Sequence, residues 1–381
     1  MRVALLTYST RPRGGVVHTL ALAEALAAAG HDLTVWTLGH GGGFYRDVDP
    51  RVRTRVVPFP EREGEGVGPR ILRSIDLLAA ELRPAGGAYD VVHAQDCISA
   101  NAALRAGLPF LRTVHHLDDF TTPELAGCHE RAIVAPAAHV CVSAAVAAEL
   151  AHRWGVHATV IPNGVDADRF AAADPAPWRA RLGRYVLAVG GIEPRKGSIE
   201  LVEAYSRLRR RLPDVRLVIA GGETLFDYRD YRARWERRAT DLGVEPLVLG
   251  PVPDAHLPAL VAGAAAFAFP SLKEGFGMAA LEALAAGVPT VVADLPVFRE
   301  VFTGTVAFAG TPGELAEALA DAVTAPDPGR RAAGRRLAAR HTWAAAAAAH
   351  VDFYTSRPAA TTRAAGVGAR VALGPADGAR G

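Results

Sequence analysis

The chain has 381 residues, of which half are hydrophobic and 22% are charged, and its formal net charge is +2 at pH 7. This length exceeds what a single hydrophobic core usually supports, so we expect two domains. The Arg residues are scattered among Asp and Glu, which excludes the electrostatic footprint of a nucleic-acid-binding protein.

The cysteines and the apolar runs narrow the class of protein further. Cys97, Cys128 and Cys141 are odd in number and lack the spacing of metal ligands, so they indicate buried free thiols and neither a disulfide framework nor a zinc site. The first apolar run is too short for a signal peptide, and no run has the length that spans a membrane. We expect a cytoplasmic protein.

The first half of the chain alternates between strands and helices. A predicted strand over residues 2–8 leads through a glycine loop into a helix over 16–29, which ends at Gly30. Further strands are predicted at 33–38, 52–57, 90–93, 110–114, 140–142 and 159–161, and helices at 69–82, 99–106 and 143–154. This alternation favours a parallel sheet covered on both faces.

The second half repeats the pattern after a connection at 162–176 that is rich in Pro, Gly and Asp. Strands are predicted at 185–189, 216–220, 247–249, 266–269 and 290–293, and helices at 198–212, 278–286, 312–323 and 343–354. Residues 356–381 lack an apolar period, and we expect a disordered tail.

These elements predict an α/β protein with two Rossmann-like, doubly wound parallel-sheet domains, over residues 1–170 and 171–342. Parallel sheets of this kind bind ligands at the carboxyl ends of their strands, and such ends from two domains can face one cleft. The chemistry is therefore expected in the loops that lead from strands into helices.

Two of these loops have features of a phosphate site. Gly14 and Gly15 precede the first helix, where backbone amides can approach a phosphate, although a tight turn would explain them equally. Arg195 and Lys196 precede a helix in the second half, where they oppose the helix dipole unless an anion binds between them. A diphosphate is the obvious anion, and a solvated charged turn is the alternative.

A third loop adds two carboxylates. Glu274 lies in the loop with Gly275, Phe276 and Gly277, whose backbone amides are unobstructed at the start of a helix. Glu282 lies inside that helix among Ala and Leu, and a buried carboxylate needs polar partners. The hydroxyl groups of a ribose would supply them, so the two carboxylates can serve neighbouring parts of one ligand.

The run 270–277 together with 282–289 resembles the E-x7-E signature of family 4 glycosyltransferases with the GT-B fold. Supporting matches lie at Gly14-Gly15, 90–93, 113–115, 161–166 and 195–197, so the resemblance covers about residues 1–355. It implies retaining transfer of a hexosyl group from a UDP- or GDP-sugar to an unidentified hydroxyl acceptor, with no metal or other cofactor. The final helix, 343–354, is similar to the family helix that returns to the N-terminal domain.

The resemblance also implies roles for the matching residues. Lys196 and Arg195 would hold the leaving diphosphate, Glu274 the hydroxyls of the transferred sugar, and Glu282 the ribose. Gly15 would offer a backbone contact near the diphosphate and shape the acceptor side. The amides of Phe276 and Gly277 would lie near sugar and phosphate, and His115 would project toward the donor sugar. A loop histidine without contact to the substrate is the alternative for His115.

The chain departs from the family pattern in three places. Gly191 stands where family members commonly have an arginine, and Arg195 is the candidate replacement. His116 follows His115 directly, so either imidazole could face the cleft. Asp118 and Asp119 could bind an acceptor hydroxyl or be solvated loop carboxylates.

Other functions use parts of the same pattern. A sugar-nucleotide epimerase or hydrolase, or a non-enzymatic sugar-nucleotide sensor, would bind the same donor without an acceptor. A nicotinamide-dependent dehydrogenase would need the full glycine fingerprint, which the first loop lacks. The loops at 39–49 and 59–68 are expected to determine the specificity for the base, the sugar and the acceptor. The sequence leaves open the oligomeric state and a peripheral membrane contact.

Overall fold

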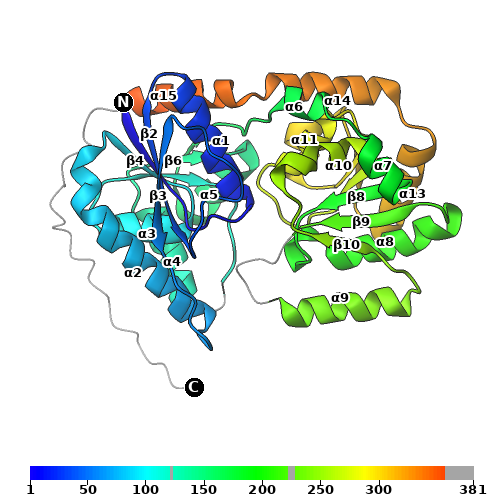
Figure 1. The fold of residues 1–381 in the computed structure, drawn as a ribbon, viewed down its shortest axis with the longest axis horizontal. Coiled ribbons are helices and arrows are strands. Elements are labelled where there is room, and N and C mark those ends of the chain that lie inside the picture. Colours follow the sequence, from blue (N-terminus) through cyan, green and yellow to red (C-terminus); the bar gives the residue numbers. More distant parts are fainter. Residues whose placement is uncertain (121–122, 222–227, 357–381) are drawn as a thin grey trace, which may run out of the picture.

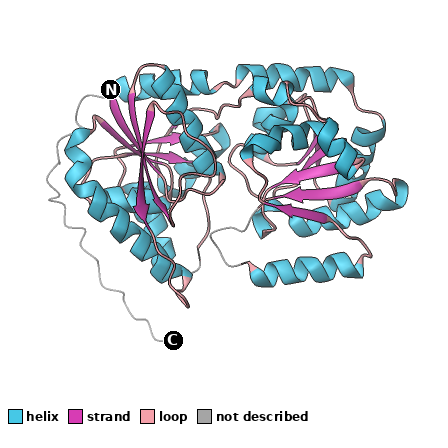
Figure 2. Ribbon diagram, viewed as in Figure 1, coloured by secondary structure: helices cyan, strands magenta, loops and turns pink. Residues whose placement is uncertain are grey.

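The computed structural model describes residues 1–120, 123–221 and 228–356. The chain forms two lobes that lie side by side, one from each half of the sequence (Figure 1). Each lobe contains one sheet with helices on both of its faces (Figure 2). The predicted fold class, two doubly wound parallel-sheet domains, is confirmed.

The N-terminal sheet has seven parallel strands in the order β3-β2-β1-β4-β5-β6-β7. Its strands are β1 (Arg2–Leu6), β2 (Asp32–Gly39), β3 (Val52–Pro58), β4 (Val91–Ala94), β5 (Leu111–Val114), β6 (Ala138–Cys141) and β7 (Thr159–Val160). Its helices are α1 (Gly14–Ala28), α2 (Val67–Ala85), α3 (Cys97–Arg105), α4 (Pro123–Val134) and α5 (Ala144–Trp154).

The alternation of side chains along β1 divides the N-terminal core between two faces. Ala4 and Leu6 pack in one cluster with α2 and α3, while Val3 and Leu5 pack in another with α1. Successive strand residues point to opposite faces, so a strand buried on both sides reads as an unbroken apolar run. This apolar run is the pattern from which β1 was predicted in the sequence.

The C-terminal sheet has six parallel strands in the order β10-β9-β8-β11-β12-β13. Its strands are β8 (Tyr185–Val189), β9 (Arg216–Ala220), β10 (Leu247–Gly250), β11 (Ala266–Phe269), β12 (Thr290–Ala293) and β13 (Ala307–Ala309). The helices of this half are α6 (Ala167–Ala171), α7 (Ala176–Leu182), α8 (Ser198–Arg211), α9 (Arg229–Asp241), α10 (Leu257–Gly263), α11 (Met278–Ala285), α12 (Pro296–Phe302), α13 (Pro312–Thr324) and α14 (Pro328–Arg340).

The strand order reverses direction between β1 and β4 in one sheet and between β8 and β11 in the other. Ligands of doubly wound sheets bind outside the carboxyl ends of the strands at such a switch point. The three loops singled out in the sequence follow β1, β8 and β11, and each leads toward a helix. All three therefore begin at a switch point.

Two stretches of chain connect the lobes, and they lie against each other. Residues 161–166 lead into α6, and the chain returns along α14 into α15 (Trp343–Thr355), which packs on α1 (Figure 1). Val165 N donates a 2.8 Å hydrogen bond to His341 O. A Cβ at Gly164 would overlap the backbone of Trp343, so only glycine allows this close approach. Apart from Ser356, the predicted tail lies outside the described residues.

Candidate functional site

The two lobes touch at the loops that follow β5 and β11. The α-carbon of Gly275 lies against the carbonyl oxygen of His115, and a Cβ at position 275 would overlap that oxygen. Lys273 Nζ lies 3.1 Å from Asp119 Oδ2, and the carboxylate of Glu300 on α12 accepts hydrogen bonds of 2.7 and 2.8 Å from Ala144 N and Ala145 N at the start of α5. The structure therefore has the lobes in contact beside the predicted site.

The predicted cations and carboxylate of the C-terminal lobe form one ion cluster. Lys196 Nζ lies 2.7 Å and Arg195 Nη1 3.1 Å from Glu274 Oε2, and Arg195 Nη2 lies 3.2 Å from Glu193 Oε1. The loops after β8 and β11 are tied together by Leu272 N, which donates to Arg195 O at 2.8 Å. Glu274 and Glu193 thus supply the negative charge that the sequence argument assigned to a bound anion.

The cluster holds Glu274 in its ionised form. Burial opposes ionisation, but the charges of Lys196 and Arg195 outweigh it and lower the pKa of Glu274 to about 2. Lys196 also lies 4.8 Å from the ring centroid of Phe269, a cation–π distance. An ionised Glu274 and the two cations that it holds, Lys196 and Arg195, therefore lie at the carboxyl end of the C-terminal sheet.

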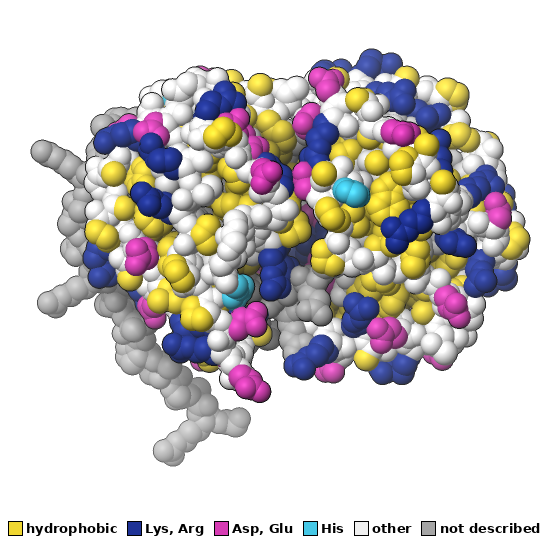
Figure 3. All heavy atoms as spheres, in the orientation of Figure 1, with side chains coloured by type: hydrophobic (Ala, Val, Ile, Leu, Met, Phe, Trp, Pro, Cys, Tyr) yellow, Lys and Arg dark blue, Asp and Glu magenta, His cyan; other side chains and the backbone are white. Residues whose placement is uncertain are grey.

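A cavity of about 1230 Å³ lies between the lobes. Figure 3 shows charged side chains beside the hollow between them. One wall comes from α1 and residues 44–47 of the N-terminal lobe, and the other from α6, residues 253–257 and α11. Of the predicted site residues, only Glu282 lines this cavity. Lys196, Glu274 and His115 do not line the cavity. They lie in the loops beside the contact between Gly275 and His115.

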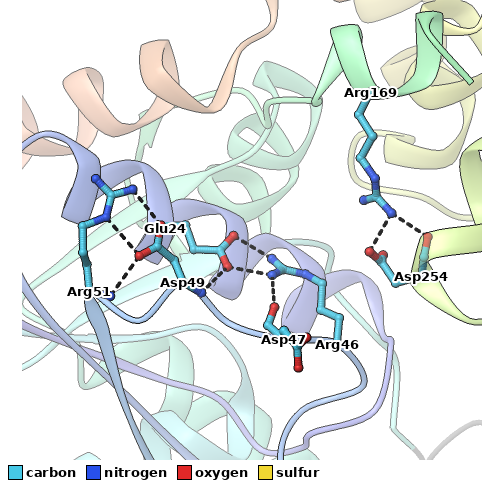
Figure 4. Close-up of polar contacts among 7 residues, drawn as sticks. All are labelled: Glu24, Arg46, Asp47, Asp49, Arg51, Arg169 and Asp254. Carbon is cyan, nitrogen blue, oxygen red and sulfur yellow. Dashed lines mark hydrogen bonds and ion pairs between the residues drawn. The ribbon is translucent and has the colours of Figure 1, made fainter.

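Two arginine–carboxylate pairs face the cavity from opposite walls (Figure 4). Arg46 donates to both carboxylate oxygens of Glu24, at 2.6 and 2.7 Å, and this pair fixes the loop that carries Tyr45. Arg169 on α6 lies 2.6 Å from Asp254 Oδ2. The bidentate pair of Arg46 and Glu24 adds geometric specificity to the charge attraction. Sequence reasoning missed all four residues, although Arg46 lies within the loop 39–49 that it singled out.

Glu282 points into this cavity without a hydrogen bond or ion pair among the described residues. Burial raises the pKa of Glu282 to about 8, an effect that Arg169 partly offsets. A carboxylate in this position is costly unless a ligand brings hydrogen-bond donors to it. The site is therefore suited to a ligand with hydroxyl groups.

His115 follows β5 and lies close to the start of α1. Its ring would be 3.8 Å from a Cβ at Gly15, and burial together with His116 and Arg112 lowers the pKa of His115 to about 3. The imidazole is therefore neutral at physiological pH. Its Nε2 is buried and has no hydrogen-bond partner among the described residues.

The remaining predicted residues fall into two groups. His116 Nε2 lies 3.2 Å from Asp118 Oδ2, while Asp119 is exposed and pairs with Arg153 and Lys273. The structure thus places His116 beside Asp118 within the loop after β5, while Asp119 forms ion pairs with Arg153 and with Lys273 of the other lobe.

The predicted glycines lie where a side chain would be excluded or where the backbone is close to another segment. Gly277 has φ +100°, and a Cβ there would be 3.0 Å from Phe302 and 3.1 Å from Phe298. Gly191 lies beside Gly221, and Gly14 lies near Met278 of the other lobe. Phe276 has its ring in the C-terminal core, so only its backbone is free for a ligand.

Unpaired buried polar atoms gather near the carboxyl ends of β4 and β5. Among the described residues, these are side-chain atoms of Gln95, Arg112 and His115, and Asp96 beside them accepts a hydrogen bond from Thr7. Burial raises the pKa of Asp96 to about 6 and the pKa of neighbouring Tyr8 to about 12. Buried polar groups are rarely left without partners, so this end of the sheet is suited to ordered water or a polar ligand. The one signal in the sequence was the position of Gln95 and Asp96, two and three residues after the predicted strand 90–93.

No helix among the described residues combines the length and the apolar character needed to cross a membrane. No group of three or more His, Cys, Asp or Glu side chains in the described ranges is placed to hold a metal ion.

Comparisons with known proteins agree with this architecture. Residues 12–169 match the model for Glycosyltransferase Family 4, and residues 179–335 match the model for Glycosyl transferases group 1. The two matches cover one lobe each. They include the glycine pair of the first loop and the whole of the other two loops.

Curated relatives match over nearly the whole chain. A phosphatidyl-myo-inositol mannosyltransferase from Mycobacterium tuberculosis is 31% identical, over 97% of this chain and 99% of its own length. A D-inositol 3-phosphate glycosyltransferase from Xylanimonas cellulosilytica is 32% identical, over 93% of this chain and 96% of its own length. Both relatives are transferases, so an epimerase, hydrolase or non-enzymatic sensor is not favoured.

Solved structures agree in fold. The structure of Anabaena Alr3699/HepE in complex with UDP and glucose matches this chain with a TM-score of 0.74 at 19% identity. The match covers 94% of this chain and 100% of that chain. With its two doubly wound lobes and these relatives, the chain belongs to the family 4 glycosyltransferases of the GT-B fold.

Proposed function

We propose that this glycosyltransferase moves a hexosyl group from a nucleoside-diphosphate sugar, with UDP or GDP as the nucleotide, to a hydroxyl acceptor with retention of configuration. The observation that carries the proposal is Glu282, whose carboxyl group has no partner among the described residues and lies in the wall of a cavity of about 1230 Å³ between the lobes. A ribose presents two neighbouring hydroxyl groups, which match the two oxygens of this carboxyl group.

The diphosphate would bind between Lys196 and the start of α11. The first backbone amides of α11 have no partner within the helix, and they carry the positive end of its dipole. Lys196 is held 2.7 Å from Glu274. An incoming phosphate would compete for Lys196 and release an oxygen of Glu274 to bind the hydroxyls of the sugar. Arg195 would replace the arginine absent at position 191 as the second cation.

The transfer step needs no strong protein base. The bond between the anomeric carbon and the diphosphate oxygen breaks, the acceptor oxygen bonds to the same face of that carbon, and the acceptor proton passes to the departing diphosphate. Lys196, Arg195 and the amides of α11 would stabilise the charge that develops on the leaving group. The fixed positions of donor and acceptor supply the remaining acceleration. We propose that this chemistry proceeds without a metal ion, so activity should survive a chelator.

The N-terminal lobe would bind the acceptor. We propose a division into residues 1–170 with the returning helix, and residues 171–342, except that α6 packs on α10 and α11 and therefore goes with the C-terminal lobe. His115 and Gly15 would border the donor sugar from the N-terminal lobe, and Gln95 and Asp96 would offer polar atoms to the acceptor. His116, Asp118 and Asp119 are further acceptor-side candidates. The two curated relatives are named for inositol-containing compounds, so inositol and its phosphates are the first acceptors to test.

The test begins with a thermal-shift panel of UDP, GDP and their common sugar conjugates, because a ligand that binds only the folded state raises the unfolding temperature. The stabilising donor is then incubated with inositol, inositol phosphates and the enzyme, and the anomeric configuration of the product is read by NMR. We expect a product with the configuration of the donor. Free sugar without a glycosylated acceptor would indicate a hydrolase, and no stabilisation by any nucleotide would contradict the proposal.

A further inference from the structure

His18 is a buried residue of α1 that lies between the cleft and both connections of the lobes. Its ring centroid is 4.7 Å from that of His115, with the rings at 77°, and 5.4 Å from the ring of Trp343 at the start of α15. His18 Nδ1 lies 2.8 Å from Oδ1 of Asn163, in the connection that leads out of the N-terminal lobe. One side chain therefore contacts the outgoing connection, the returning connection and the cleft histidine.

The contact with Asn163 fixes the form of His18. An amide oxygen only accepts hydrogen bonds, so His18 Nδ1 must carry the proton and Nε2 must have the free lone pair. Burial holds the pKa of His18 well below its usual value, which keeps the ring neutral. Asn163 is itself only 3% exposed, so water does not compete for this bond. The hydrogen bond to Asn163 therefore determines both the tautomer and the ring plane of His18.

A structural role alone explains this arrangement poorly. The Nε2 atoms of His18 and His115 are both buried and without a hydrogen-bond partner among the described residues. Buried polar atoms without partners destabilise a fold, and apolar side chains of similar size would fill the same space without that cost. The neighbouring His93 differs, because Tyr354 and Thr113 occupy both of its nitrogens, at 2.8 and 2.9 Å.

We propose that Asn163 and His18 are positioning residues that fix the orientation of the His115 imidazole relative to the two connections between the lobes. The backbone supports this path, because Gly164, next to Asn163, packs directly on Trp343. Asn163 and Trp343 move with the connections when the lobes rotate, and His18 passes that displacement to His115. The inference rests on the proposed role of His115 at the donor sugar.

The first arm of the test needs no substrate. Histidine labelled with 15N and 13C allows NMR to report the tautomer of each imidazole in the wild-type protein, in Asn163→Ala and in Tyr354→Phe. Tyr354→Phe is the matched control, because it also removes one partner of a buried histidine, at the junction of α15 and the N-terminal lobe. We expect His18 in the Nδ1–H form in the wild type, and we expect Asn163→Ala alone to shift the signals of both His18 and His115.

The second arm is kinetic. Misplacing a group at a reacting centre can cost about 10²-fold, so kcat of Asn163→Ala should fall by up to that factor while KM for the donor stays near the wild-type value. His18→Asn provides a second variant, because its amide can still bond to Asn163 while the ring that touches His115 is lost. We expect His18→Asn to lose kcat as well, and Tyr354→Phe to retain it.

The outcomes separate the two proposals. If His115 signals are unchanged in folded Asn163→Ala, the positioning role is refuted. If His115 signals shift but turnover is unaffected, the coupling stands and the role of His115 at the donor fails.

Discussion

Gly275 of the C-terminal lobe packs its α-carbon on the carbonyl oxygen of His115 in the N-terminal lobe. No side chain fits between them while the lobes are in contact. The contact joins the loop that contains Glu274 to the one that contains the cleft histidine. Because groups from both lobes are proposed to act on one sugar, this contact would define the closed, active arrangement.

Gly275→Ala should therefore force the lobes apart without unfolding either of them. We expect a loss in kcat of about 10²-fold and a larger radius of gyration by small-angle X-ray scattering. Gly87→Ala is the control, because a Cβ at Gly87 meets nothing within 4 Å. A Gly275→Ala enzyme with wild-type turnover would show that this contact is not part of the active state.

Lys196→Ala should abolish most transfer and leave the fold intact. Glu274 keeps Arg195 as a partner at 3.1 Å, so the variant does not leave a buried charge without a counterion. Loss of one group that stabilises the charge of a transition state typically costs 10² to 10³-fold in kcat, and we expect about that effect. Lys196→Arg should restore only part of the rate, because guanidinium and ammonium groups bind phosphate with different geometry.

The other lysine of the chain provides the comparison. Lys273 pairs with exposed Asp119, and exposed ion pairs contribute little to stability. Lys273→Ala should keep most of the activity. Circular dichroism and turnover of the three variants check the prediction, and equal losses in Lys196→Ala and Lys273→Ala would point to a general charge effect.

Glu282 should make the stability of the ligand-free protein fall as the pH rises. The pKa of Glu282 is about 8 in the folded protein, against the ordinary value of 4.5 for a glutamate, so the folded state holds a proton that the unfolded state has released. The stabilising effect is complete below pH 4.5 and is lost as the pH rises through 8. One such proton corresponds to a slope of up to about 1.4 kcal/mol per pH unit within that window.

Glu282→Gln removes this titration, so its stability relative to the wild type should increase between pH 5 and 8. Denaturant unfolding of both proteins at several pH values without ligand measures the difference. Parallel stability curves would mean that Glu282 is already ionised, and its side chain would then need a partner in the free protein.

Glu300 should favour contact between the lobes. Its carboxylate accepts from two backbone amides at the start of α5, where a negative charge is also favoured by the helix dipole. Glu300→Gln should shift the lobes toward an open arrangement, with a larger radius of gyration and a higher KM for the donor. Glu317→Gln removes an exposed pair with Arg211 inside the C-terminal lobe and should change neither. Identical scattering curves for both variants would exclude this role.

The sheet strands were the most predictable part of the fold. β8 and β9 have the bounds expected from their apolar runs, because strands buried on both faces leave a continuous signal in the sequence. Sequence reasoning missed α4, α6, α7, α9, α10, α12, α14 and the short strand β13. Of α9 only Tyr231, Trp235 and Ala239 are buried, and such a sparse stripe among arginines gives a weak helical period.

The site was predictable at the level of loops and not of contacts. The motifs identified Lys196, Glu274 and Glu282, but nothing in the sequence indicated that Lys196 pairs with Glu274, because the residues are 78 positions apart. The wall formed by Tyr45, Arg46 and Glu24 depends on how a loop folds over α1. Such contacts are set by tertiary packing, which no local pattern encodes.

Calorimetric titration with UDP and GDP tests the central claim most directly, using the wild type, Lys196→Ala and Glu282→Gln. We predict that one nucleotide binds the wild type and that each variant binds it about tenfold or more weakly, because Lys196→Ala loses a charge-assisted hydrogen bond and Glu282→Gln replaces one of the two carboxyl oxygens that would bind the ribose. Unchanged affinity in both variants, or no binding of either nucleotide to the wild type, would contradict a site built from Lys196 and Glu282.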